Sequence, residues 1–537
     1  MSLNFNRPVR PATIFVTFVL AITFLMSSTL LLAQTTVGNG SIQGTVTDPS
    51  GAVVNGAKIT ITEKSQGTTT HVTSDSKGTY SSGALIPGTY VVRVEASGFK
   101  TTEVAVNVQV GNTANGNAKL ELGQASQIVE VEANTVAVNT EQATVQGVIT
   151  ESQIENLPVN GRNFLDLAQL EPGVQIQDGQ NFDPTKAGYS SISFGGRFGR
   201  TARIEVDGVD VSDETVGTTT TDIPASAIQE FQISQSSLDM STELTSSGAV
   251  NVTTKSGSNS FHGEAFGQFR DSQFAAALPT PPGFSAPFQR SQYGGAFGGA
   301  IIKNKLFFFM DGERTIQHTA VPVPISAPFS AFSGTFADPF HEGNLLGRVD
   351  YQVTKNVRAF FRYSYFKNIL GATFGYGYSL YDNKDITRNE VAGIDFNTGG
   401  FSHAIRFSFL KFQNQIVDAT TGSTLPFANI HAELFMGATG LVAGPNLLAP
   451  QSTPQSDHQI KYDGSKIIRS HVIRYGFGFN HIQGGGFASF FKNGPQVISA
   501  VNTTEIANAG NPAIGIFPGG IANPFNYPAD SVTVANG

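Results

Sequence analysis

The residues best suited to chemistry lie in the middle of the sequence. Four carboxylates stand close together there: Asp207, Asp210, Asp213 and Glu214. Carboxylate oxygens bind hard cations, but a calcium site needs a fuller set of oxygen ligands than this cluster offers. Three arginines precede the cluster: Arg197, Arg200 and Arg203. A polar turn whose carboxylates pair with these arginines is therefore the favoured interpretation, and a cation site is the alternative.

The sequence has no pattern typical of an enzyme or of a cofactor site. It lacks the motifs G-x-x-x-x-G-K-[ST], H-E-x-x-H and G-x-S-x-G, and its 9 histidines are scattered without a pair at ligand spacing. The absence of cysteine excludes disulfides, thiolate metal sites and a thiol nucleophile. We therefore expect no catalytic residue, no metal site, no cofactor and no enzymatic activity.

Composition and the first residues bound the class and the compartment. The 537 residues suffice for about two to four domains, and the net charge of -8 gives no reason to expect a nucleic-acid partner. Arg7 and Arg10 precede an apolar run over residues 12–33, and a polar stretch follows from Gln34. This pattern predicts a signal peptide over residues 1–33, cleaved after Ala33. An uncleaved membrane anchor is the alternative, because the apolar run is long.

Residues 38–122 read as short alternating strands separated by turns, which predicts a β-sandwich. Four stretches resemble the motifs of the carboxypeptidase-regulatory-like domain: 44–48, 51–57, 75–80 and 87–90. The resemblance implies a transthyretin-like sandwich and an accessory role without peptidase activity.

Residues 135–257 have the mixed pattern of a small α+β domain. Thr150, with Gln153 three residues later, predicts a capped short helix that ends before Pro158, and the apolar spacing over 163–170 predicts a second one. The strand over 204–206 runs into Asp207-Gly208, a dipeptide typical of a tight hairpin turn.

Several motifs of this domain resemble, in the family's order, the plug of TonB-dependent outer-membrane receptors of the Oar-like type. The motif stretches are 156–162, 206–210, 223–231 and 248–257. The plug-motif residues within them are Leu157, Pro158, Asn160, Gly161, Arg162, Asp207 and Gly208. In that family the regulatory-like domain also precedes the plug.

The linker over 123–134 carries a short apolar and charged alternation. Its residues are Gln127, Ile128, Val129, Glu130, Val131, Glu132 and Ala133. Such a segment could be added to the sheet edge of a partner protein; an ordinary linker and the plug's first strand are the alternatives. By position, the family resemblance implies that this segment is the TonB box.

From residue 258 to 537 the chain changes to strands of about ten residues, each with an apolar and a polar face. Examples are 261–270 and 357–365. Tight links such as 303–305 alternate with long ones such as 315–343, as in outer-membrane barrels, whereas a soluble sandwich or propeller is the alternative. We count about nine strands before Ala488, and barrels that hold a plug have about 22. We therefore expect a mainly β protein whose antiparallel transmembrane barrel is incomplete, from a fragment or a truncated gene.

The resemblance implies a receptor that imports an unidentified ligand across the outer membrane of a Gram-negative-type bacterium. Its implied partners are the TonB energy-transducing complex in the periplasm, outer-membrane lipid and an unknown extracellular ligand. A structural or adhesive surface protein and a truncated, non-transporting product are the alternatives.

Overall fold

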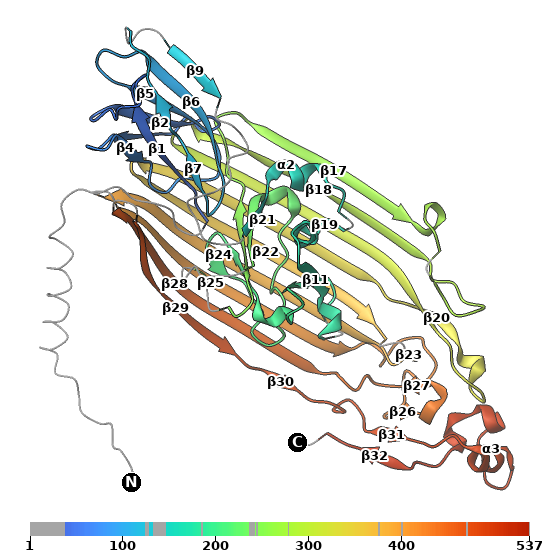
Figure 1. Ribbon diagram of the computed structural model, residues 1–537. Coiled ribbons are helices and arrows are strands. Elements are labelled where there is room, and N and C mark those ends of the chain that lie inside the picture. The colour runs from blue at the N-terminus through green and yellow to red at the C-terminus, as the bar shows by residue number, and fades with distance from the viewer. Residues whose placement is uncertain are drawn as a thin grey trace, which may run out of the picture.

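The computed structural model describes most of the chain after the first apolar run (Figure 1). The described residues are 38–123, 128–132, 146–159, 161–183, 186–235, 242, 245–277, 279–373, 376–398, 401–468 and 471–535. The predicted signal peptide, and Gln127, Ala133 and Asn160 from the predicted sites, lie outside them. Among the described residues, no helix is long and apolar enough to cross a membrane.

The first domain is a β-sandwich of two sheets. One sheet has the order β4-β1-β7, with β8 also paired to β1, and the other has the order β3-β2-β5-β6-β9. The strands are β1 (Ser41–Thr47), β2 (Lys58–Glu63), β3 (Thr69–Thr73), β4 (Thr79–Ser81), β5 (Gly88–Glu95), β6 (Thr101–Val108), β7 (Thr113–Asn115), β8 (Ala118–Lys119) and β9 (Ile128–Glu132). Alternate residues such as Val92, Val94 and Val104 are buried between the sheets, as the period of two dictates.

The second domain is the α+β domain expected from the sequence. Its sheet has the order β10-β15-β16-β13-β14, beside a two-stranded sheet of β11 and β12. The main elements are β10 (Gln146–Ile149), α2 (Glu151–Asn156), η1 (Phe164–Leu170), β11 (Val174–Asp178), β12 (Ser190–Phe194), β13 (Arg203–Val206), β14 (Val209–Asp210), η4 (Ala225–Ala227), β15 (Ile228–Ser234) and β16 (Ala249–Thr254). The Gln153 side chain accepts a hydrogen bond from the Thr150 amide at 2.9 Å, which starts α2. The second predicted helix, η1, is a 3-10 helix started by the Asn163 side chain.

The third part is a large antiparallel sheet that faces the α+β domain with one side (Figure 1). Within the described residues its long strands follow chain order. They are β17 (His262–Asp271), β18 (Phe288–Ile302), β19 (Leu306–Val323), β21 (Phe340–Thr354), β22 (Val357–Ala372), β24 (Tyr381–Thr398), β25 (Phe401–Asp418), β28 (Gln451–Ile468) and β29 (His471–Gly484). β20 (Gly334–Ala337) pairs with β19, and β30 (Phe487–Ala488) pairs with β28. The path begins at β17 and ends at β29, so these strands form an open wall rather than a closed barrel.

Two features of this wall are typical of a membrane barrel. Side chains on the face away from the α+β domain are apolar and exposed, among them Tyr293, Phe297, Phe361, Phe407 and Phe477. The tight links fall where the sequence predicts them, for example between Ile302 and Leu306. The strands, however, reach 18 residues in β19, β24, β25 and β28. A membrane needs only about 9–11 residues, so the strands extend past it into the segments predicted as long loops.

Beyond the long strands lies a small module at the end of the wall opposite the sandwich (Figure 1). Its sheet has the order β23-β27-β26-β31-β32, and α3 (Thr503–Gly510) packs beside it. The strands are β23 (Gly377–Tyr378), β26 (Glu433–Phe435), β27 (Val442–Ala443), β31 (Gln496–Ile498) and β32 (Ser531–Thr533). Phe329, Leu434 and Met436 are buried in a separate core there.

Candidate functional site: the contact between the α+β domain and the barrel wall

The Asp207-Gly208 turn is the centre of the contact. It joins β13 to β14, with Val206 paired to Val209 across a two-residue loop. Asp207 has φ 53° and Gly208 has φ 86°, the left-handed pair that a type I′ hairpin turn requires. Aspartate and glycine adopt this conformation at low cost, which explains the choice of residues. The turn therefore aims the Asp207 carboxylate at the wall.

The Asp207 carboxylate binds two arginines of neighbouring wall strands. Its Oδ1 lies 2.9 Å from Arg348 Nη1 of β21, and its Oδ2 lies 2.9 Å from Arg362 Nε of β22. It also accepts hydrogen bonds from the backbone amide and the hydroxyl of Thr254 at 3.0 and 2.9 Å. Burial acts to raise the pKa of Asp207, but the two guanidinium groups outweigh it and hold the pKa below its usual value.

The wall around Asp207 is a buried ionic network. Arg348 also binds the Asp350 carboxylate with two nitrogens, at 2.9 and 3.0 Å. Arg362 is fully buried and donates to the Asn389 side chain at 2.7 Å. Arg406 pairs with Asp395 at 2.7 Å and donates to the Asp207 carbonyl at 3.2 Å. Every charge at this point of the contact thus has a partner of opposite sign.

Further polar contacts join the two parts. Lys461 of β28 pairs with Glu205 of β13 at 3.0 Å, and both side chains are buried. Gln459 binds the backbone of Asp210 on both sides, accepting from its amide at 3.0 Å and donating to its carbonyl at 2.8 Å. Apolar wall residues, among them Phe309 and Leu410, also complete the core of the α+β domain. The contact therefore combines apolar packing with buried ion pairs.

The acidic cluster forms ion pairs with basic side chains. Asp213 pairs with Lys186 at 2.7 Å. Arg203 lies 3.3 Å from Asp210 and 2.7 Å from Glu214, as the sequence suggests. Burial raises the pKa of Asp210 to about 7, against the opposing effect of Arg203. No group of three or more His, Cys, Asp or Glu residues suited to a metal ion occurs among the described residues.

The turn at Gly161-Arg162 makes a second contact with the wall. Both residues have positive φ, at 89° and 61°. Arg162 Nε lies 3.2 Å from the Glu313 carboxylate of β19, and its guanidinium lies 3.8 Å from the Phe266 ring centroid of β17. The Leu157 side chain is exposed. Gln292 of β18 also donates a hydrogen bond to the Gly161 carbonyl at 3.1 Å. Of the predicted plug-motif residues, Gly161, Arg162 and Asp207 therefore contact the wall.

The candidate TonB box contributes a strand to the sandwich. Its described part, β9, pairs in parallel with β6, with Thr101 opposite Ile128 and Ala105 opposite Glu132. β9 is the last strand of that sheet. The segment is thus extended and hydrogen-bonded through its backbone within the chain, and its role as a TonB box stays a prediction.

Sequence reasoning missed the wall residues that bind the plug motif. Arg348, Arg362 and Lys461 are charged residues at positions of their strands that face the α+β domain. Charges at inward positions of a barrel strand are the only local signal, and that signal does not identify their partners.

Comparison with known proteins agrees with this architecture. Residues 41–121 match the carboxypeptidase regulatory-like domain, and residues 253–342 match the outer membrane beta barrel domain. The TonB-dependent transporter Oar of Myxococcus xanthus is 27% identical over 294 residues, covering 50% of this chain and 26% of the relative. The crystal structure of the outer membrane transporter YddB from Escherichia coli has a TM-score of 0.52 at 10% identity, covering 66% of this chain and 50% of that chain. This last likeness shows the fold alone.

These matches define the class. The chain carries a regulatory-like sandwich and part of an outer-membrane barrel, and it is a homologue of a TonB-dependent transporter. Its place is accordingly the outer membrane, and none of the matched descriptions is that of an enzyme. The chain spans about a quarter of the length of the curated relative it matches.

Proposed function

We propose that this chain acts in a TonB-dependent outer-membrane receptor that imports an unidentified ligand. The observation that carries the proposal is a domain held against a membrane wall by buried ion pairs at Asp207 and Glu205 and by a partly buried one at Arg162. Charged groups regain hydration when they separate, so withdrawing this domain costs much less than the sum of its Coulomb attractions. A plug that must leave and return needs such a contact.

The proposed mechanism assigns a role to each part of the chain. The segments are a signal peptide (1–33), a sandwich (38–122), a linker with the TonB box (123–134), a plug (135–257) and a partial barrel (258–537). The TonB complex pulls from the periplasm on the segment 127–133. The pull separates Asp207 from Arg348 and Arg362, and the displaced plug opens a path for the ligand along the wall.

The sequence contains no cysteine, so a single engineered cysteine is the one thiol that a maleimide can label in this chain. Thr220 is fully buried, and its carbonyl accepts a hydrogen bond from the Thr387 hydroxyl of the wall. A Thr220→Cys variant in growing cells should react with a small maleimide only when the plug moves. We expect fast labelling in cells with TonB and slow labelling when TonB is deleted or when residues 128–132 are replaced by glycine and serine.

A Ser50→Cys variant is the matched control, because Ser50 is exposed in a turn of the sandwich. It should be labelled equally in all three strains, and the amount of protein in the outer membrane should not change. Equal labelling of Thr220→Cys with and without TonB contradicts the proposal and favours a structural or adhesive surface protein.

A further inference from the structure

The wall carries four basic side chains on the face that points away from the α+β domain. Residues at even spacing share one face of a strand, and exposed apolar side chains mark the outward face. Each marker has a basic residue at even spacing on its own strand, farther from the tight turn. The pairs are Met310 and Arg314 on β19, Phe361 and Lys367 on β22, Ile394 and Arg388 on β24, and Phe407 and Lys411 on β25. We call these four basic residues the basic patch.

The register of the sheet brings the basic patch together. Arg388 is directly paired with Lys411, and Lys367 lies diagonal to Arg388. Lys367 also pairs with Gly343 of β21, and Gly343 pairs with Arg314. A Cβ at position 343 would lie 3.3 Å from Arg314 Nη1, so the guanidinium lies over the glycine. The patch spans five neighbouring strands, about 19 Å at the usual strand spacing.

The described part of the chain does not neutralise the basic patch. None of its four side chains forms an ion pair there, whereas Lys384 on the same face pairs with Asp382 at 3.4 Å. Glu390 of β24 is the other carboxylate near the patch on the described outward face, so four basic residues meet one acid. Like charges directly opposite each other, as in Arg388 and Lys411, destabilise a sheet. An anion bound between them removes that repulsion.

The basic patch lies at the border of the apolar band that is farther from the tight turns. Lys367 stands ten residues after Val357, where β22 begins, and Lys411 stands ten residues after Phe401, where β25 begins. Ten residues of strand rise about 33 Å, and a tilt of about 40° reduces this to about 25 Å across the membrane. The apolar band of an outer-membrane barrel has about this height. Because tight turns lie in the periplasm, the patch meets the outer leaflet.

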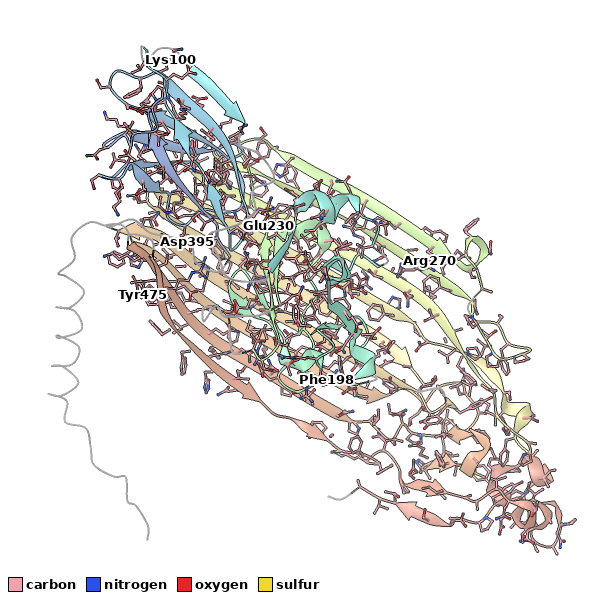
Figure 2. All side chains as sticks on the ribbon, viewed as in Figure 1. Lys100, Phe198, Glu230, Arg270, Asp395 and Tyr475 are labelled. Atoms are coloured by element: carbon pink, nitrogen blue, oxygen red, sulfur yellow. The ribbon has the colours of Figure 1, made fainter. Side chains whose placement is uncertain are left out.

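The border near the tight turns is built differently. Lys305 Nζ lies 5.8 Å from the ring centroid of Tyr351, and Lys466 Nζ lies 3.8 Å from that of Phe401. Tyr475 is a further exposed ring at this end of the wall (Figure 2). The lysines of this border thus lie over aromatic rings, an interaction that stabilises a cation without an anion. The basic patch has no such ring contact among the described residues.

We propose that the basic patch binds the phosphate groups of a glycolipid in the outer leaflet of the outer membrane. Arginine binds phosphate through two parallel hydrogen bonds, and lysine adds a compact charge. The apolar band next to the patch, including Tyr363 and Tyr365, contacts the acyl chains and sugar rings of the same molecule. A free phosphate gains only the first of these contacts. A patch about 19 Å wide also suits a headgroup with more than one phosphate.

The test measures the binding of a phosphorylated glycolipid to the full chain, purified in an uncharged detergent. The probes are lipid A with two phosphates and the same lipid after removal of both phosphates. Native mass spectrometry gives the bound fraction against lipid concentration. We expect lipid A to bind about tenfold or more tightly than its dephosphorylated form. Equal binding of the two lipids overturns the inference.

A pair of double variants locates the site. Arg388→Gln with Lys411→Gln should weaken the binding of lipid A about tenfold. Lys305→Gln with Lys466→Gln is the matched control, because it removes the same charge at the other border, and its affinity should stay within about threefold. Equal losses in the two double variants, or no loss in the first, mean that lipid A is not bound at the patch.

Gly343→Asp reaches the same site while it keeps all four basic residues. Its carboxylate lies between Arg314 and Lys367 and competes with the phosphate, so binding should again fall about tenfold. The slow labelling of Thr220→Cys without TonB should not change in any of these variants, because their side chains point away from the α+β domain. Unchanged binding of lipid A to Gly343→Asp overturns the inference.

A competition experiment separates the lipid from a free anion. Inorganic phosphate at the same concentration as lipid A should displace little of it, because the acyl chains and sugar rings contribute to binding. Displacement of half or more of the bound lipid A assigns the basic patch to free phosphate and overturns the lipid as its ligand.

Discussion

Replacing Asp207 by asparagine tests the ionic contact between the α+β domain and the wall. Asparagine also adopts positive φ readily, so the turn conformation is kept. Its side-chain oxygen can still accept from the Thr254 amide, and its NH2 group replaces the oxygen that faces Arg362, so the substitution removes the charge and one acceptor. Arg348 keeps its two-nitrogen contact with Asp350, whereas Arg362 loses its ion pair and keeps only neutral partners. The effect therefore comes mainly from a fully buried, uncompensated guanidinium.

The magnitude follows from that geometry. Removing one partner of a buried ion pair costs about 3–5 kcal/mol. With a urea dependence of about 2 kcal/mol per molar, the urea midpoint for exposure of Thr220→Cys should fall by about 1.5–2.5 M. The assay follows maleimide labelling of this cysteine against urea concentration in the purified chain. Adding Arg362→Gln to Asp207→Asn should restore part of the loss, because the two residues are in direct contact.

The matched control is Asp210→Asn. The Asp210 carboxylate binds Arg203 within the α+β domain, and its contacts with Gln459 of the wall use only its backbone. Its pKa of about 7 also means that less than a full charge is removed near neutral pH. The midpoint should change much less than in Asp207→Asn. An unchanged midpoint in Asp207→Asn, or equal effects of the two substitutions, would refute the ionic contact as the main attachment.

Three further substitutions test separate parts of the structure. Arg162→Gln removes the ion pair with Glu313 and the stacking on Phe266, and it should lower the same urea midpoint by about 1 M. The midpoint of Arg162→Lys should lie between those of Arg162→Gln and the unmodified chain, because lysine keeps the charge and lacks the planar group. Gly208→Ala strains the turn at φ 86° and should destabilise it by about 1 kcal/mol, seen as faster hydrogen exchange in the β13–β14 hairpin and not in the sandwich. Burial raises the pKa of Glu230 to about 8 from a usual value of 4.5, so the folded state binds the proton more tightly than the unfolded state. The contribution of Glu230 to stability is then greatest below about pH 4.5 and falls as pH rises towards 8, by about 3 kcal/mol at pH 7. The backbone amide of Val110 donates a hydrogen bond to the Glu230 carboxylate. Glu230→Gln should slow hydrogen exchange around Val110 at pH 8 relative to the unmodified chain and leave it similar at pH 4.5; a parallel pH dependence in both proteins would exclude Glu230 as its source.

The sequence by itself determined the local features of this protein. The period of two placed the strands of the sandwich and the wall, because each strand has one buried and one exposed face. The Asp207-Gly208 pair predicted its turn, because few other dipeptides adopt two successive positive φ angles. The order of the motifs also indicated the class of receptor that the comparisons support.

Only the tertiary structure decided which residues meet. Asp207 lies 141 positions before Arg348, and nothing local tells which inward-facing charge of which strand will reach the turn. That choice depends on the stagger of the wall strands and on how the α+β domain packs against them, and both follow from many distant contacts together. The place of β9 was equally open, since five alternating residues pair with any suitable edge. The backbone pairing with β6 joined the described part of the candidate TonB box to the sandwich.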